Sequence, residues 1–153
     1  MPAAPSTAAN DLPLNDFLCF AVYSANLAFG RAYAPILEAL GLTSYTQFIA
    51  IVALSETNEQ SVNSLGDKLF LESNTLTPIL KKLDALGYIK RRRDPADERV
   101  VLVSLTADGR RVRERARDIG LTAEACGLGK DFAKVQKSIA RLRDNLVAST
   151  RGE

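Results

Sequence analysis

The sequence predicts a mainly α-helical protein with one small β-hairpin. Apolar residues recur at helical spacing along most of the 153 residues, which is the pattern of helices that bury one face. Two short runs of β-branched or basic residues flank a charged turn, which is the pattern of a hairpin. Neither an internal repeat nor a long linker divides the chain. Its length therefore fits one domain, or one protomer of a dimer with long helices.

The first two helices are delimited by proline, glycine and capping residues. We expect the first to begin near Asn15, to be kinked by Pro35 and to end at Gly41. Thr43 or Ser44 can cap a second helix that follows directly, because a hydroxyl oxygen accepts a hydrogen bond from the free amides of a first turn.

The next two helices have the order of a helix-turn-helix. Ser61 can cap a short third helix, and Glu72 or Ser73 opens a fourth helix that Gly87 closes. The apolar stripe of the fourth helix consists of Leu76, Ile79, Leu80, Leu83 and Leu86. A short helix joined by a few residues to a longer one is the arrangement that lays the second helix in a DNA groove.

The hairpin is followed by two more helices. Tyr88–Arg93 and Arg99–Leu105 are predicted to pair, Thr106 caps a fifth helix, and small residues over Ala125–Gly129 precede a sixth. The sixth helix carries one apolar stripe, made of Phe132, Val135, Ile139, Leu142 and Leu146. The apolar faces of the first and last helices exceed what a small globule can cover. Pairing with a second copy is the simplest way to bury them.

Composition excludes several classes of protein. No apolar run approaches the ~20 residues of a membrane span. The first ten residues have neither a basic nor an apolar signal region, so we expect a loose arm and a cytoplasmic protein without a membrane partner. Histidine is absent, which excludes His-based triads and His metal ligands. The two cysteines are 107 residues apart and match no disulfide framework or zinc spacing, so we expect no metal and no cofactor.

Positive charge is concentrated in one part of the chain. Residues 61–117 carry 13 Lys/Arg against 8 Asp/Glu, a net charge of +5, whereas the other 96 residues carry 7 and 10, a net charge of −3. A local excess of basic residues is the electrostatic footprint of a phosphate-binding surface. Double-stranded DNA is therefore the expected partner.

The fourth helix supplies the first set of candidate DNA contacts. When its apolar stripe faces inward, small polar residues near its start and lysines further along share the outer side. Hydroxyl and amide groups can bond base edges, and lysines can meet phosphates. The candidates are Ser73, Asn74, Thr75, Thr77, Pro78, Lys81 and Lys82.

The hairpin supplies the second set. Arg91, Arg92 and Arg93 end its first strand, and Arg99 lies past the turn. An arginine on a projecting turn can enter the narrow, electronegative minor groove. Asp97, two residues away, can hold Arg99 in one pose. A solvated charged turn beside an ordinary amphipathic helix is the plainer interpretation of either element alone, but both in this order favour DNA binding.

The chain resembles the MarR family of winged helix-turn-helix repressors. The matching segment is SLGDKLFLESNTLTPILKKLDALGYIKRRRDPADERVVLVSLTADG, above all its D-E-R turn and the L-T-A-D-G that follows. The resemblance extends over nearly the whole chain. It implies a symmetric homodimer on a pseudo-palindromic operator, with residues 1–42 and 106–153 forming dimerisation helices and residues 43–105 the winged helix-turn-helix.

Cys19 is the candidate for control of the DNA binding. We expect it about one turn into the first helix among apolar residues, where a free cysteine is commonly a small core residue. Tyr23 at i+4 can approach its sulfur. Tyr33 lies 14 residues on, about 21 Å along the same helix, so it can reach only the Cys19 of a partner copy. Tyr45 can approach from the same side. Phenolic donors around a thiol near a helix start favour oxidation.

The segment LCFAVYSANLAF is similar to the organic-hydroperoxide-sensing branch of the family, the OhrR-type repressors. The resemblance implies that Cys19 is the peroxidatic cysteine, with Tyr23, Tyr33 and Tyr45 as phenolic neighbours. Ser44 is an extra residue relative to the branch, so Tyr45 comes one position late. Cys126 fits the resolving cysteine of the two-cysteine class, which condenses with the sulfenic acid of the other subunit.

Three hypotheses follow for function. The leading one is a repressor released from its operator when an organic hydroperoxide oxidises Cys19, followed by an intersubunit disulfide to Cys126. The second is a repressor of the same kind controlled by a small apolar or phenolic ligand without redox chemistry. The third is a thiol peroxidase. The absence of histidine and of a C-x-x-C motif disfavours it, so we do not expect an enzyme.

Overall fold

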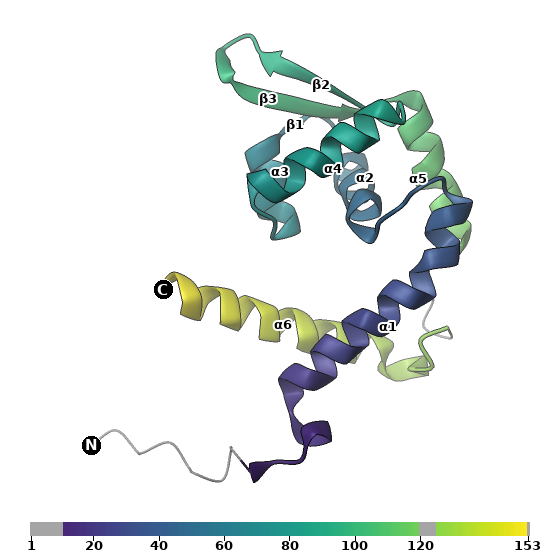
Figure 1. Cartoon of the computed structure of the whole chain (residues 1–153), viewed down its shortest axis with the longest axis vertical. Helices are drawn as coiled ribbons and strands as arrows, with labels where there is room; N and C mark the ends of the chain where they lie inside the picture. Colours follow the sequence, from purple (N-terminus) through teal and green to yellow (C-terminus); the bar gives the residue numbers. More distant parts are fainter. Residues whose placement is uncertain (1–10, 120–124, 153) are drawn as a thin grey trace. The chain divides into compact units, whose positions relative to one another are not determined.

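The computed structural model describes residues 11–119 and 125–152 (Figure 1). The arm predicted at residues 1–10 lies outside the described residues. The chain separates into two compact units, Met1–Asp118 and Ile119–Glu153. No helix of the described chain is long and apolar enough to span a bilayer.

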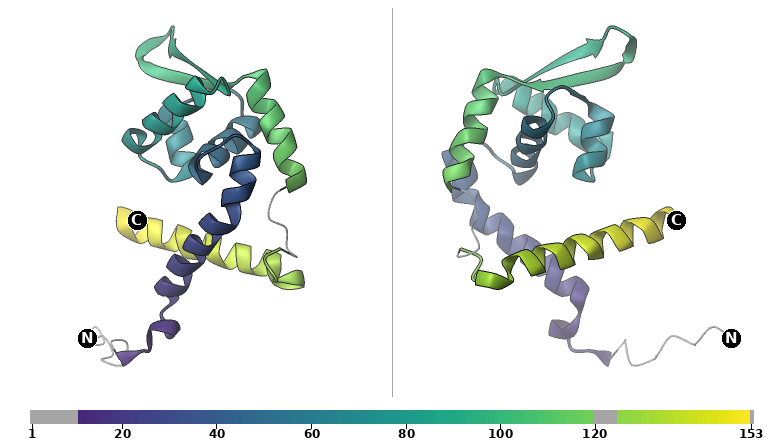
Figure 2. Two further views of the ribbon diagram at one scale, coloured as in Figure 1. Left: turned by 45° about the vertical axis from the view of Figure 1, so that its right-hand side comes forward. Right: turned by 180° about the vertical axis from the view of Figure 1, so that it is seen from behind.

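The elements follow the predicted order, mainly helical with a small antiparallel sheet. Helices of the first unit are α1 (Leu18–Ala39), α2 (Tyr45–Glu56), α3 (Val62–Leu69), α4 (Ser73–Ala85) and α5 (Ala107–Ile119, which ends at the unit boundary). Its strands are β1 (Gln60–Ser61), β2 (Ile89–Asp94) and β3 (Asp97–Leu105). The second unit holds a short 3-10 turn, η3 (Gly129–Asp131), and α6 (Phe132–Arg151). Within the first unit, the β2–β3 hairpin projects beyond helices α3 and α4 (Figure 2).

The start of the first helix differs from the prediction. Asn15 lies in a separate 3-10 turn, η2 (Leu14–Asp16), and α1 begins at Leu18. The reason is Phe17, whose extended backbone (φ −77°, ψ 119°) separates the two helical segments. Helix α1 then continues as an α-helix past Pro35. It ends as predicted, because Gly41 adopts φ +73° directly after it.

The capping residues act as the sequence predicts. The Ser44 hydroxyl accepts a hydrogen bond from the Gln47 amide at the start of α2, 3.3 Å away. Ser61 caps α3 in the same way through Ser64, at 3.1 Å. Thr106 accepts from the Gly109 amide at 3.1 Å and so caps α5. Glu72 occupies the cap position of α4 without a side-chain cap bond.

The sheet contains a strand that the sequence analysis missed. Gln60 and Ser61 form β1, which pairs antiparallel with β3, so the strand order is β1-β3-β2. Two residues are too few to produce a periodic pattern. The hairpin itself is confirmed, although β3 begins at Asp97 rather than Arg99. In the β2–β3 register, Ile89 faces Leu105 and Arg91 faces Val103.

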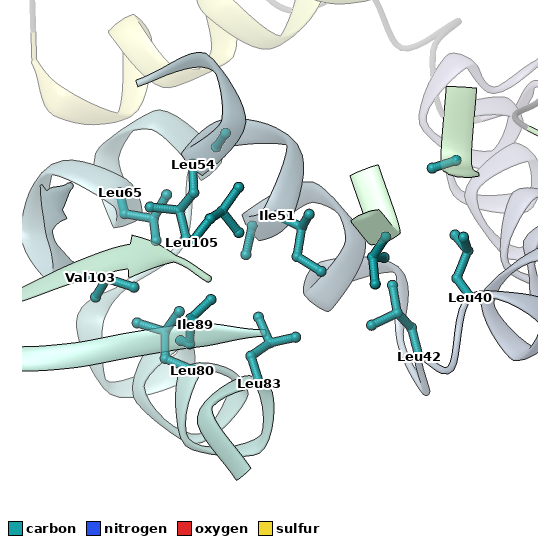
Figure 3. Close-up of a cluster of buried hydrophobic side chains, with 14 of the residues drawn as sticks. Leu40, Leu42, Ile51, Leu54, Leu65, Leu80, Leu83, Ile89, Val103 and Leu105 are labelled. Carbon is teal, nitrogen blue, oxygen red and sulfur yellow. The ribbon is translucent and has the colours of Figure 1, made fainter. Parts of the chain in front are cut away.

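One hydrophobic core joins the helix-turn-helix to the sheet (Figure 3). Leu54 from α2, Leu80 and Leu83 from α4, Ile89 from β2 and Val103 from β3 are at most 1% exposed. All buried apolar residues of the described chain lie between positions 37 and 116.

Leu86 corrects the predicted stripe of α4. It lies after the last residue of the helix, where the chain turns into β2, and is 45% exposed.

Candidate nucleic-acid interface and cysteine site

A tight turn between α3 and α4 sets the position of the second helix. The Leu71 amide donates to the Gly66 carbonyl at 2.9 Å, and Phe70 adopts a left-handed backbone with φ +58°. A Cβ atom on Gly66 would lie 2.6 Å from the Leu71 carbonyl oxygen. Glycine is therefore required there for α3 to approach the turn closely.

The predicted residues of α4 divide into two groups. Two of them are partly buried and bonded within the protein: the Ser73 hydroxyl donates to the Asn63 amide oxygen at 2.6 Å, and the Thr77 hydroxyl donates to the Ser73 carbonyl at 2.7 Å. The exposed group consists of Asn74, Thr75, Pro78, Lys81 and Lys82. This exposed side carries amide, hydroxyl and ammonium groups, the types that bond base edges and phosphates.

The tip of the hairpin is held by its own side chains. The Arg99 guanidinium makes two hydrogen bonds of 3.0 Å to the two carboxylate oxygens of Asp97, as the sequence analysis expected. Arg93 donates to the Glu98 carbonyl at 3.1 Å, and the Ala96 amide donates to Asp94 at 2.9 Å. The Arg99 side chain nevertheless remains 90% exposed, so the tip presents an oriented cation to solvent.

The Asp97–Arg99 ion pair at the tip also shifts the pKa of both side chains. The hydrogen bonds from Arg99, first through its side chain and then through its amide, lower the pKa of Asp97. The Asp97 carboxylate correspondingly raises the pKa of Arg99. Both groups are therefore charged at neutral pH, and the bidentate geometry restricts how the guanidinium can turn.

The base of the hairpin contains two ion pairs that the sequence analysis missed. Arg91 contacts Asp84 of α4 at 2.9 Å. Arg92 contacts Glu59, 33 residues away, at 2.7 Å. Arg91 and Asp84 are only seven residues apart in the sequence, which is a weak indication that they pair. No local sequence pattern links Arg92 to Glu59.

Cys19 is the second residue of α1, earlier in the helix than predicted. Its thiol is free and exposed, and among the described residues it makes no hydrogen bond. Tyr23, one turn further along, is 60% exposed. Cys19 is therefore not a core residue of this protomer, and solvent reaches its sulfur.

Two of the three predicted phenols meet at the other end of α1. The rings of Tyr33 and Tyr45 have centroids 5.0 Å apart, and Phe48 packs against both. Ser44 caps α2, so Tyr45 becomes the first residue of that helix and faces Tyr33. Burial, and then the neighbouring Tyr33, raise the pKa of Tyr45, so its hydroxyl is a proton donor at neutral pH.

Cys126 belongs to the second unit and lies in the turn before η3. Its thiol is free and partly exposed. In the part of the chain that the structure describes, no group of three or more Cys, Asp or Glu side chains is arranged to hold a metal ion.

The comparisons with known proteins agree with this geometry. The family model of the transcriptional regulators SarA/Rot matches residues 31–115. The organic hydroperoxide resistance transcriptional regulator of Bacillus subtilis is 36% identical over 140 residues, which are 88% of this chain and 92% of that protein.

Solved structures of AbfR, a protein of Staphylococcus epidermidis, are similar as well. Reduced AbfR bound to DNA is 31% identical with a TM-score of 0.69 and covers 85% of this chain and 90% of its own. Disulfide-formed AbfR is 33% identical with a TM-score of 0.59 and covers 83% and 90%.

These relatives are transcriptional regulators and not enzymes, and the exposed α4 side and oriented wing fit that role. The chain belongs to the MarR family of winged helix-turn-helix repressors, among relatives of the organic hydroperoxide resistance regulator, and is a DNA-binding transcriptional regulator.

Proposed function

We propose that this regulator is a homodimeric repressor that leaves its operator when an organic hydroperoxide oxidises Cys19. The observation that carries the proposal is the free, exposed thiol in the first turn of α1. The thiolate is the form of cysteine that attacks peroxides, and an exposed cysteine is open to such an attack. The B. subtilis relative, by its name, acts in resistance to organic hydroperoxides.

The need for a second copy follows from the terminal helices. On α1, Leu18 is 63% exposed and Phe29 is 49% exposed; on α6, Ile139 is 48% and Leu146 is 57% exposed. Apolar side chains in such number on two helices require another apolar surface. We call residues 43–105, which hold α2, α3, α4 and the hairpin, the reading head. A twofold pair of reading heads also matches a pseudo-palindromic operator.

The dimer would complete the cysteine site. The Tyr33–Tyr45 pair cannot reach the Cys19 of its own chain, because 14 residues of helix separate Cys19 from Tyr33, about 21 Å. In a pair whose α1 helices run antiparallel, the tyrosines of one protomer would lie at the Cys19 of the other. The protonated Tyr45 hydroxyl would then donate to a thiolate or to a peroxide oxygen.

The proposed chemistry has two steps. The Cys19 thiolate attacks the terminal oxygen of the hydroperoxide, the O–O bond breaks, and the alkoxide takes a proton and leaves as an alcohol. Sulfur is oxidised to a sulfenic acid and the peroxide is reduced. The Cys126 thiol of the other protomer then displaces water, which forms a disulfide.

The test is DNA release by the reduced protein after one equivalent of cumene hydroperoxide. Cys19→Ser should keep DNA affinity and lose the release, whereas Cys126→Ser should still react, stop at the sulfenic acid and form no cross-linked chain on non-reducing gels. Release of the Cys19→Ser variant by the peroxide would reject the mechanism. Mass mapping of the oxidised protein identifies the linked peptides.

A second candidate, control by a small ligand, rests on a cavity in the first unit. The cavity has a volume of about 470 Å³ and lies where α1 meets α2, with Leu37, Leu42 and Tyr45 among its lining residues. That volume suits a small apolar or phenolic molecule. Release of DNA by such a compound under reducing conditions, with both thiols intact, would favour this candidate over oxidation.

A further inference from the structure

Arg91 and Arg92 lie side by side on β2 but point to opposite faces of the strand. Each of them meets an acid from another segment: Asp84 belongs to α4, and Glu59 lies in the loop between α2 and β1. Arg91 contacts Asp84 near the end of α4, with Nε 2.9 Å from the carboxylate. Arg92 contacts Glu59 through two nitrogens, with distances of 2.7 and 3.3 Å.

Glu59 is held in its place by its neighbours on both sides. Asn58 accepts a hydrogen bond from the Leu105 amide of β3 at 3.2 Å. The buried Gln60 side chain donates to the Ala53 and Thr57 carbonyls at 3.1 and 2.6 Å. Glu59 itself adopts φ +58°, a backbone conformation that costs free energy in a residue other than glycine. The surrounding bonds impose this conformation and leave the carboxylate facing Arg92.

Other cations of the reading head are arranged differently. Lys81, Lys82 and Lys90 are exposed and, in the described ranges 11–119 and 125–152, have no carboxylate within 4.0 Å. An unpaired ammonium can bind a phosphate and release a counterion. The Arg92 guanidinium would have to break its bonds to Glu59 of another segment before it bound a phosphate, whereas Arg99 is paired within the tip and stays 90% exposed.

We propose that Arg91 and Arg92 are positioning residues that clamp the wing, the β2–β3 hairpin, to α4 and to the α2–β1 loop. The Asp84–Arg91 pair holds β2 on one face and the Glu59–Arg92 pair holds it on the other, across the central strand β3. The clamp sets where the tip delivers Arg99. This role replaces the direct DNA contact that the sequence predicts for Arg92.

The experiment compares neutral and charge-swapped variants of the reduced protein. The probe is a short duplex selected from a random-sequence pool by binding to the unsubstituted protein. Glu59→Gln and Arg92→Gln should each weaken binding about two- to fivefold, the range of a partly exposed ion pair. The double variant E59Q/R92Q should be no weaker than either single variant. The swap E59R/R92E should restore the affinity that Arg92→Glu loses.

Salt dependence separates positioning from phosphate binding. Arg92→Gln should leave the slope of log affinity against log salt unchanged. The matched control Lys90→Gln, two residues earlier on β2, should flatten the slope by about 0.9, the value for one phosphate contact. Asp84→Asn and Arg91→Gln should behave like the first pair. Circular dichroism and unfolding midpoints check that each variant folds.

Other outcomes would overturn the clamp. Tighter binding by Glu59→Gln, a flatter slope for Arg92→Gln, unchanged affinity of both, or failure of the swap would each assign Arg92 to the DNA or to no role. No peroxide is used, so these outcomes do not bear on oxidation of Cys19. Failure of the unsubstituted protein to select any duplex would instead refute DNA binding itself.

Discussion

The reading head and the terminal helices of this chain bury their apolar residues to very different extents. Leu54, Leu65 and Leu80 of the head are at most 1% exposed, and the head forms one core together with the end of α1 and with α5. Helix α1 has only Leu37 buried, at its last turns, and α6 has no buried residue. The core of the head is thus buried within one chain, whereas the terminal helices leave large apolar side chains exposed.

The largest effect is expected in the core of the head. Leu80→Ala removes a side chain that is 1% exposed and packed between α4 and the sheet. Lost burial and the remaining cavity should lower the free energy of unfolding by about 2–5 kcal/mol. Urea unfolding followed by circular dichroism measures it. A loss below about 0.5 kcal/mol, the usual range of surface substitutions, would contradict a self-contained core.

Substitutions in the terminal helices should weaken association of two copies and leave the folding of the head unchanged. Ile139→Ser with Leu146→Ser removes two large apolar side chains from the exposed stripe of α6. If a second copy buries them, at about 1.5–3 kcal/mol per side chain, the dimer dissociation constant should rise by about a hundredfold or more. Sedimentation velocity over a dilution series measures this. Unchanged association would assign the dimer to another surface.

Two glycine-to-alanine substitutions test whether α1 is as loosely packed as its exposed residues suggest, and their expected effects on stability are smaller. Gly30 lies inside α1, and a Cβ atom there meets nothing within 4 Å, so Gly30→Ala should stabilise the protein by about 0.5–1 kcal/mol through helix propensity. The matched control is Gly109→Ala, whose Cβ would lie 2.1 Å from the Tyr88 carbonyl oxygen and should destabilise α5. Thermal unfolding measures both. Destabilisation by Gly30→Ala would mean that another surface packs against α1 at this point.

The smallest effect concerns the exposed wing tip. Because Arg99 lowers the pKa of Asp97, the Asp97–Arg99 pair is intact above the usual carboxyl pKa and is lost as pH falls through the lowered value. Carbon NMR of the Asp97 carboxyl should show this low titration midpoint. Arg99→Gln should move the midpoint up, whereas Arg111→Gln should leave it unchanged. Equal midpoints with and without Arg99 would argue against the pair.

Local patterns were sufficient to predict most of the fold. The caps Ser44, Ser61 and Thr106 and the terminator Gly41 act within one helical turn of their own position, so the sequence around them contains the whole interaction. The apolar stripe of α4 is a property of a single helix. The same reasoning failed at β1, because its two residues become a strand only through pairing with β3.

In the candidate site, too, contacts between residues close in the sequence were predicted and contacts between distant residues were not. Asp97 and Arg99 are two residues apart and their pair was expected from the sequence. The pairing of Arg92 with Glu59 spans 33 residues and depends on how β1 and β2 flank β3, so no local pattern contains it. The cysteine site is harder still, since the proposed partners of Cys19 belong to another molecule.

The arginine run also governs how the sheet edge behaves. β2 is one of the two outer strands of the order β1-β3-β2, and it presents Lys90, Arg91, Arg92 and Arg93 in succession. An open strand edge invites pairing with another sheet, and a row of cations repels a second identical edge. Lys90 has no carboxylate partner among the described residues, and Arg93 donates only to a backbone carbonyl, so these two side chains would oppose the pairing of two such edges into one continuous sheet.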